Sequence, residues 1–257
     1  MLSNARFVEA RALVSPESGA RWVEAAGAYA MFDGVESPIT QTFGLGLFQT
    51  ATREDLARLE EFFHTRGADA SHEVSPLADP LTPALLNERG YQPVEFTNAM
   101  FRPSGRGALP AERGGGAAPS VRVIEEGERE LWAQTSARGW ADSGYGDFML
   151  GLALVSTRRA DSASFLAELD GRPVATGALS LCEGVALFAG ASTVPEARGR
   201  GAQTSLLDAR LRYAAERGCD LAMMCALPGT ASQRNAERKG FRIAYTRVKW
   251  RLARPAS

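Results

Sequence analysis

The 257-residue sequence has few cysteines and histidines, the residues that form disulfides and often bind transition metals. It contains only three cysteines and two histidines, which are Cys182, Cys219, Cys225, His64 and His72. An odd number of cysteines without metal-ligand spacing is typical of reduced thiols in a cytoplasmic protein. We therefore expect neither a disulfide framework nor a metal site.

The sequence also lacks an excess of charge and a long apolar run. Its 29 Lys and Arg residues nearly balance its 30 Asp and Glu residues, which leaves a formal net charge of −1. This balance gives no electrostatic support for binding to nucleic acid or to a membrane surface. No apolar run reaches the roughly 18 residues of a membrane span, and the N-terminus has no signal pattern. We expect a cytoplasmic protein, monomeric or homodimeric, with neither kind of partner.

Glycine, proline and alanine are concentrated in one internal segment, residues 103–119. Such a composition cannot build a core and is typical of a linker. The length of the chain suits two small domains. We predict a first domain at residues 1–102 and a second at residues 120–257.

The most informative segment is the basic, glycine-rich turn Arg198–Ala202. The apolar run Val185–Ala191 precedes it, and the amphipathic stretch Ala202–Arg217 follows it. A strand, a glycine turn and a helix start together direct backbone N–H groups at an anion, and arginines add charge-assisted contacts to phosphate. The sequence has neither the Gly-Lys-Ser/Thr of a P-loop nor, at Thr204, the third glycine of a dinucleotide fingerprint. An ordinary basic turn with a helix cap remains the alternative.

The turn resembles the acyl-CoA pyrophosphate loop of the GNAT superfamily of N-acetyltransferases, written Gln/Arg-x-x-Gly-x-Gly/Ala. Arg198 and Gly201 fit that pattern, whereas Gln203 stands where a small residue is usual. The closing Lys239-Gly240-Phe241 is similar to the Gly-Phe that ends the last helix of the family. The predicted elements follow the family's order: strands at 121–124, 164–169, 174–181, 185–191, 221–226 and 241–250, and helices at 128–139, 147–158, 202–217 and 230–239. The resemblance implies a mixed α/β fold, with a twisted mixed sheet flanked by helices.

The first half of the chain looks like a degenerate copy of the second. Segments 55–102 and 206–252 each contain a helix ending in Arg-Gly, a strand, a short helix ending in a basic residue, glycine and an aromatic residue, and a final strand. Such self-similarity suggests a duplication, although two unrelated units remain the alternative. In place of the glycine turn, the first copy has Phe48–Asp55, which contains no glycine and ends in Glu54 and Asp55. Because carboxylates at a helix start repel a pyrophosphate, we predict a GNAT-like first domain without a cofactor.

The resemblance implies a set of contacts to acetyl-CoA in the second domain. It assigns the backbone of the strand end to the pantetheine arm, the glycine turn to the pyrophosphate, and two polar residues of the short helix to the amides of CoA. The residues concerned are Ser192, Thr193, Val194, Arg198, Gly199, Arg200, Gly201, Ala202, Gln203, Ser232 and Asn235. A plain edge strand, and a short helix that is capped by Ser232 and carries a solvated Asn235, are the alternatives.

The acceptor and the proton transfers are less well defined. In this fold, one loop lines the acceptor site, and it contains four candidates for binding a cationic amine: Trp140, Asp142, Tyr145 and Asp147. An ordinary polar loop explains them equally well. Many family members have a tyrosine as general acid four residues before the glycine of Gly-Phe, where this sequence has Ala236. No catalytic residue is assigned.

These observations predict an acetyl-CoA-dependent N-acetyltransferase that modifies a primary amine, most simply that of a small molecule. The missing tyrosine leaves open an acyl-CoA-binding sensor or pseudoenzyme without transfer activity, and a purely structural pair of domains is the third possibility. The sequence does not identify the acceptor, because acceptor specificity lies in loops that vary on a common scaffold.

Overall fold

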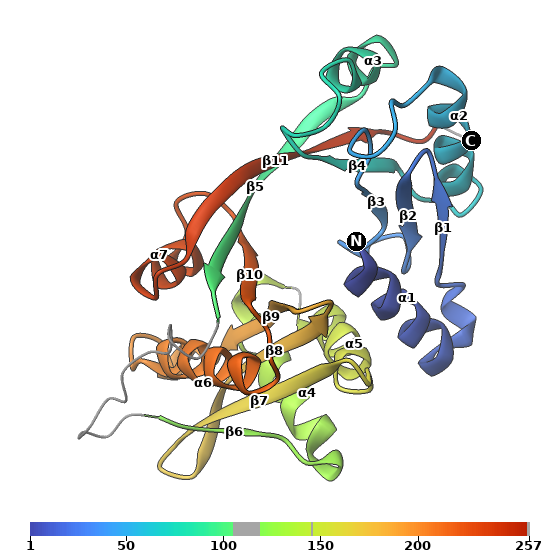
Figure 1. Cartoon of the computed structure of the whole chain (residues 1–257). Coiled ribbons are helices and arrows are strands. Elements are labelled where there is room, and N and C mark those ends of the chain that lie inside the picture. Colours follow the sequence, from blue (N-terminus) through green and yellow to red (C-terminus); the bar gives the residue numbers. More distant parts are fainter. Residues whose placement is uncertain (105–118, 145, 256–257) are drawn as a thin grey trace. The chain divides into compact units, whose positions relative to one another are not determined.

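The computed structural model describes residues 1–104, 119–144 and 146–255, so most of the predicted linker and Tyr145 lie outside the described residues. The chain forms two compact units (Figure 1). The first consists of Met1–Ala99 with Ala244–Ser257, and the second of Met100–Ile243.

The first unit has a mixed sheet with helices on both faces. Its strands run in the order β1-β2-β3-β4-β11-β5, with β3 parallel to β4 and β11 antiparallel to β4. Helix α1 packs on one face, against Met31 and Phe43, and α2 covers the other face through Leu56, Leu59 and Phe63. The elements are α1 (Leu2–Val14), β1 (Arg21–Ala25), β2 (Ala28–Phe32), β3 (Gln41–Phe43), α2 (Arg53–His64), β4 (Ala70–Val74), α3 (Thr82–Glu88), β5 (Gln92–Pro103) and β11 (Arg242–Leu252).

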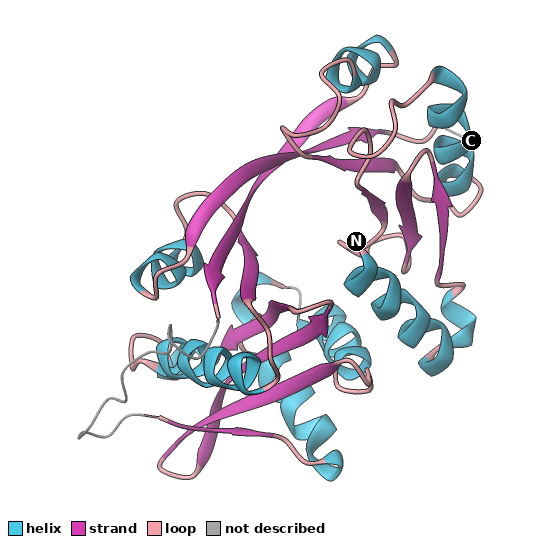
Figure 2. Cartoon of the chain, in the orientation of Figure 1, coloured by secondary structure: helices cyan, strands magenta, loops and turns pink. Residues whose placement is uncertain are grey.

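The second unit has the same layered construction (Figure 2). Strands β6 to β9 form an antiparallel meander, and β10 adds to it parallel to β9. Helices α4 and α5 cover one face around the buried Trp132, and α6 covers the other through Leu206, Leu207 and Leu211. The elements are β6 (Ser120–Val123), α4 (Arg129–Arg138), α5 (Gly146–Ser156), β7 (Ser162–Leu169), β8 (Arg172–Cys182), β9 (Val185–Thr193), α6 (Ala202–Glu216), β10 (Leu221–Ala226) and α7 (Ala231–Arg238). The predicted mixed α/β fold is confirmed, and the order of elements agrees with the expected one.

The repeated segments end their helices in the same way. Gly67, Gly90, Gly218 and Gly240 follow α2, α3, α6 and α7, and all have φ between 74° and 86°. In each case the N–H of the next residue donates to the carbonyl five residues earlier, at 2.9 to 3.1 Å. Only glycine adopts this left-handed cap at no steric cost. The Arg-Gly and Gly-aromatic motifs of the sequence are therefore helix stop signals in both copies.

The boundary of the second unit differs from the expected one, because β11 contributes to the first unit. Residues 120–257 were expected to form one domain, but β11 pairs along β4, with Trp250 opposite His72. Trp250 and Leu252 pack against the core of the first unit. The end of β5 takes the place beside β10 instead, where Ser104 N donates to Asp220 O at 2.8 Å. Periodicity predicts that a strand forms, but it does not say which free sheet edge the strand will pair with.

His72 is part of the core of the first unit. Its side chain is fully buried, and Nε2 lies 2.9 Å from the hydroxyl of Tyr91. Burial lowers the pKa of His72 to about 3, so the ring is neutral at physiological pH. The residue therefore has a packing role.

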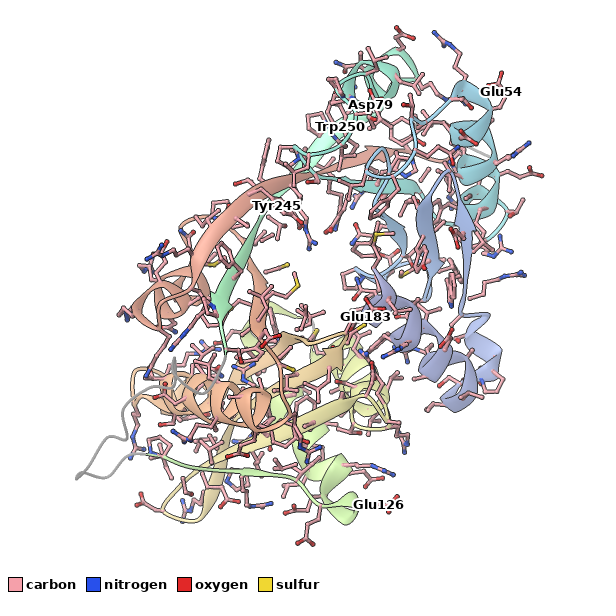
Figure 3. The ribbon with its side chains drawn as sticks, in the orientation of Figure 1. Glu54, Asp79, Glu126, Glu183, Tyr245 and Trp250 are labelled. Atoms are coloured by element: carbon pink, nitrogen blue, oxygen red, sulfur yellow. The ribbon has the colours of Figure 1, made fainter. Side chains whose placement is uncertain are left out.

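The exchange of β11 gives a test at Trp250, which Figure 3 labels on that strand. Trp250→Ala removes a large, partly buried side chain from the core of the first unit, so we expect the free energy of unfolding to fall by about 2–3 kcal/mol. Urea unfolding followed by circular dichroism measures this loss. The matched control is Arg251→Ala, at the exposed neighbouring position of the same strand, which should stay within about 0.5 kcal/mol of the wild type. Equal stabilities of the two variants would contradict the packing described here.

Candidate functional site

The two parallel strands of the second unit separate towards their carboxyl ends. β9 and β10 pair only from Val185 opposite Leu221 to Phe188 opposite Met224. β9 continues for five more residues to Thr193, and β10 for two more to Ala226. The facing backbone groups beyond Phe188 are thus released from the β9–β10 ladder. Such a gap between parallel strands offers hydrogen-bonding groups to a ligand.

A β-bulge accompanies this separation. The register between β8 and β9 shifts between Thr176 and Ala178. On β9, Gly190 has φ of 60°, and a Cβ there would lie 3.2 Å from the Trp132 ring and 3.3 Å from the Ala178 Cβ. The hydroxyl of Thr176 donates to the Gly190 carbonyl at 3.1 Å. Bulges bend a strand and change the direction of its groups, so this one directs the end of β9 away from β10.

A pocket of about 590 Å³ lies at this separation. Its walls come from the end of α4, the end of β9, the glycine turn, the first half of α6, β10 and α7. The lining residues are Gly139, Trp140, Ala191, Ser192, Thr193, Ala197, Arg198, Gly199, Gly201, Ala202, Gln203, Thr204, Leu207, Arg210, Met224, Ala231, Ser232, Asn235 and Arg238.

The N-terminus of α6 opens into this pocket without a side-chain cap. Gly199 and Gly201 have φ of 78° and 84°, which lets the chain turn tightly into the helix. The first helical hydrogen bond runs from Ser205 N to Gly201 O at 3.0 Å. The N–H groups of residues 202–204 have no hydrogen-bond partner in the described part of the chain, and the first turn contains no acid. Three free donors and the positive end of the helix dipole are suited to an anion, which makes this helix start a candidate anion site.

The equivalent helix of the first unit starts in the opposite way. The Thr52 side chain accepts from Asp55 N at 3.1 Å, and the Asp55 carboxylate accepts from Thr52 N at 3.0 Å. This is a capping box, and Glu54, labelled in Figure 3, adds a second carboxylate to the first turn. The start of α2 is therefore closed by its own side chains and negatively charged.

The pocket in the second unit is cationic. Three arginines contribute to its lining, Arg198, Arg210 and Arg238, whereas no Asp or Glu is among the described residues that line it. The α7 residues Ser232, Asn235 and Arg238 follow each other at a spacing of three and share a face. Arg238 was absent from the predicted set, although continuing the same spacing beyond Asn235 would have found it.

Arg198 spans the mouth of the pocket. Its Nη1 forms an ion pair with the Asp142 carboxylate at 2.7 Å, and its Nη2 donates to Gly139 O at 3.1 Å. The two side chains are 50% and 61% exposed, so the pair contributes at most about 1 kcal/mol to stability. Arg198 can therefore leave Asp142 at little cost when an anion competes for it.

Most of the expected cofactor residues line the pocket, and two do not. Ser192, Thr193, Arg198, Gly199, Gly201, Ala202, Gln203, Ser232 and Asn235 are lining residues. Val194 is instead buried in the core, and its N–H is committed to Val174 O at 2.9 Å. Arg200 is exposed and lies outside the lining.

The side chains of Ser192 and Gln203 are used inside the protein. Ser192 Oγ donates to Ser136 O at 2.7 Å, so it points into α4. Gln203 Nε2 donates to Ser192 O at 2.8 Å and to Thr193 Oγ1 at 3.0 Å. The glutamine that replaces the usual small residue therefore ties the start of α6 to the end of β9.

The four predicted acceptor residues do not form one cluster. Trp140 lines the pocket and Asp142 lies at its mouth, whereas Asp147 is exposed in the first turn of α5 and outside the lining. Tyr145 is not among the described residues. Ala236 is fully buried in the core, so the position of the missing tyrosine is outside the pocket lining.

The comparison with protein families identifies this unit. Residues 125–241 match the model of the acetyltransferase (GNAT) family, so this part of the chain is a GNAT acetyltransferase domain. No curated protein matches the sequence. The described residues contain no helix long and apolar enough to cross a membrane, and no group of His, Cys, Asp and Glu in them could hold a metal ion.

Solved structures share the architecture over nearly the whole chain. A GCN5-related N-acetyltransferase from Kribbella flavida is 20% identical, covers 98% of this chain and 96% of its own, and has a TM-score of 0.69. A tandem GNAT protein from the clavulanic acid biosynthesis pathway is 14% identical, with 90% and 79% coverage and a TM-score of 0.61. At such identities the likeness shows the fold, which agrees with the predicted tandem of GNAT-like domains.

The packing of α4 against β9 gives a test of the pocket wall. A Cβ on Gly139 would lie 1.8 Å from Ser192 Oγ and 2.9 Å from Thr193 N, so Gly139→Ala must push α4 away from β9. We expect a loss of about 1–3 kcal/mol in the free energy of unfolding, measured by urea titration. Gly127→Ala is the matched control, because a Cβ there meets no atom within 4 Å and φ is not positive. A Gly139→Ala variant with the wild-type free energy of unfolding would contradict the close packing of α4 against β9.

Proposed function

We propose that the second unit transfers an acetyl group from acetyl-CoA to a primary amine, most simply that of a small molecule. The uncapped start of α6 in an acid-free, arginine-lined pocket carries this proposal. CoA has a pyrophosphate, a long amide-containing arm and a terminal sulfur. The pocket offers helix N–H groups, free strand backbone and polar side chains in a matching series.

Each part of CoA has candidate partners. We assign the pyrophosphate to the N–H groups of residues 202–204 and to the Arg198 guanidinium. The arm is assigned to the backbone of β9 beyond Phe188 and, across the pocket, to Ser232 and Asn235. When bound, acetyl-CoA supplies the activated acyl group. The protein then has to hold the thioester and align the amine, because orientation removes much of the entropic barrier.

The first unit is assigned no cofactor. The capping box of Thr52 and Asp55 occupies two backbone N–H groups at the start of α2, and Glu54 would repel a pyrophosphate. We therefore expect one CoA for each chain.

The acceptor is proposed to be cationic before it reacts. Asp142 is a carboxylate at the mouth of a pocket whose other charged groups are arginines, and Trp140 provides an aromatic ring nearby that suits an alkylammonium group. Because Asp142 now pairs with Arg198, CoA binding that draws Arg198 to phosphate would free Asp142 for the amine. This order of events favours acetyl-CoA as the first substrate to bind.

An acyl-CoA-binding sensor without transfer activity is the alternative. The observation that favours it is Ala236, which stands where many GNAT enzymes have their general acid and is fully buried. The two proposals share the cofactor and differ in the reaction.

Calorimetric titration with CoA tests the binding site. Arg238 lines the pocket on α7, and we assign it a further charge-assisted contact to the phosphates of CoA. We expect one CoA per chain in the wild type and at least tenfold weaker binding to Arg238→Gln, because such a contact contributes about 1.5–3 kcal/mol. Arg234→Gln is the control on the same helix, since Arg234 is exposed, outside the lining, and donates to Gly229 O. Two CoA molecules per chain, or equal affinities for all three proteins, would refute the assignment.

Transfer is measured separately, by the release of free thiol from acetyl-CoA in the presence of a panel of primary amines. Amine-dependent thiol release supports the transferase. Binding of CoA without release for any class of amine supports the sensor.

A further inference from the structure

Arg210 is an arginine buried deep in the pocket wall. Its side chain is 2% exposed, and it extends from α6 across the sheet towards the bulge. Nε donates to Leu206 O, and Nη1 donates to Ala178 O and Ala189 O, each at 3.2 Å. The guanidinium lies 4.9 Å from the centre of the Phe188 ring.

The sequence makes room for this guanidinium at Gly177 of β8. A Cβ at that position would lie 2.9 Å from Arg210 Cζ and 3.1 Å from Nε. Because the contact with Cζ is shorter than Cβ atoms make in proteins, a side chain at this position would displace the arginine. The absence of a side chain at Gly177 thus allows a charged group to lie against the backbone of the sheet.

No carboxylate neutralises Arg210 among the described residues. Within residues 1–104, 119–144 and 146–255, its polar contacts are the three carbonyls, and Nη2 donates to none of them. The nearest acid on the helix, Asp208, pairs with Lys239. Burial lowers the pKa of Arg210 to about 10, which still leaves the side chain charged at neutral pH. An unpaired buried cation is costly, and its place in the pocket lining indicates that an anion compensates it there.

The position of Arg210 along α6 indicates which anion this is. Gln203, Leu207 and Arg210 line the pocket at a helical spacing. Arg210 lies eight residues beyond the start of the helix, about 12 Å at 1.5 Å per residue. It also lies beside Phe188, where β9 and β10 begin to separate. The guanidinium thus lies beside the point where the strands separate, where the arm that carries the sulfur is assigned, and not at the glycine turn.

We infer that Arg210 stabilises the CoA sulfur as a thiolate and so performs the task left open by the missing tyrosine. This inference rests on the proposed function, because it requires CoA in the pocket. The amine nitrogen forms a bond to the acetyl carbon, the carbon–sulfur bond breaks, and its electron pair remains on sulfur. The cationic amine loses one proton to water before it attacks and a second proton to water after the carbon–nitrogen bond has formed. Arg210 keeps all its own protons and acts by charge, so no proton has to reach the sulfur.

The other charged groups of the pocket lie elsewhere. Arg198 comes from the turn before α6 and Arg238 from α7, and β8, β9 and β10 contribute no titratable lining residue. The residues of β8 and β9 that contact the guanidinium are Gly177, Ala178, Phe188 and Ala189. The charge nearest the inner end of the pocket is therefore that of Arg210.

The test compares CoA with dethio-CoA, which lacks the sulfur, in calorimetric titrations between about pH 6 and pH 9. A free thiol of this kind has a pKa of about 8.5. If Arg210 stabilises the thiolate, wild-type binding of CoA should strengthen relative to dethio-CoA as the pH rises, to at least tenfold at the alkaline end. Arg210→Gln should lose this preference while it still binds dethio-CoA. Arg210→Lys, which keeps the charge, should retain part of it.

The controls separate this role from packing and from the proposed function. Arg212→Gln, on the same helix but outside the lining, should behave as the wild type. If Arg210→Gln weakens CoA and dethio-CoA equally, or if the wild type shows no preference for the thiol, the thiolate role is wrong although the site binds CoA. If neither compound binds the wild type, the proposed function itself fails. A wild-type preference for an acyl-CoA with a terminal carboxylate, lost in Arg210→Gln, would also overturn the inference, because the cation would then serve the acyl chain.

Discussion

The start of α6 leaves backbone N–H groups without hydrogen-bond partners among the described residues, and the proposed function depends on these groups. Every helix leaves its first N–H groups without partners inside the helix, and the two equivalent helices treat this constraint differently. α2 satisfies it with Thr52 and Asp55, whereas α6 starts after Gly201 with no side-chain cap. The same element is therefore closed by its own side chains in one unit and open to a ligand in the other.

The surroundings of α6 depend on that open end. Gln203 ties the helix start to the end of β9, and Arg210 fixes the middle of the helix to the bulge through two sheet carbonyls. The bulge and the early end of the β9–β10 pairing then leave the pocket between them. The pocket lies between α6 and the end of β9. The start of α6 is proposed to hold the phosphates, the backbone of β9 the arm, and Arg210 on α6 the sulfur.

The sequence predicted the local features of this arrangement better than the long-range ones. Glycine turns, helix stops and apolar periodicity depend on neighbours in the chain, so the turn at Arg198–Ala202 and the order of the elements could be read directly. The pairing of β11 with β4 could not be predicted, because both halves offer an equivalent free edge to a final strand. Burial is also a tertiary property, so neither the core position of Val194 nor the importance of Arg210 follows from a pattern. Gly177 makes space for that arginine, but this role can be recognised only once the packing of β8 against α6 is known.

The central claim is that the uncapped start of α6 binds the phosphates of CoA. The most direct test gives α6 the carboxylate that closes α2, by means of Thr204→Asp, at the position that corresponds to Asp55 in the first unit. Calorimetry should show that the affinity for CoA falls at least a hundredfold, because the new carboxylate occupies the free N–H groups at the helix start and repels the phosphates. The thermal unfolding temperature should stay near that of the wild type, because acidic residues stabilise this end of a helix. Thr204→Ala should bind CoA nearly as the wild type does. If Thr204→Asp binds CoA with unchanged affinity, the phosphates lie elsewhere and the account is wrong.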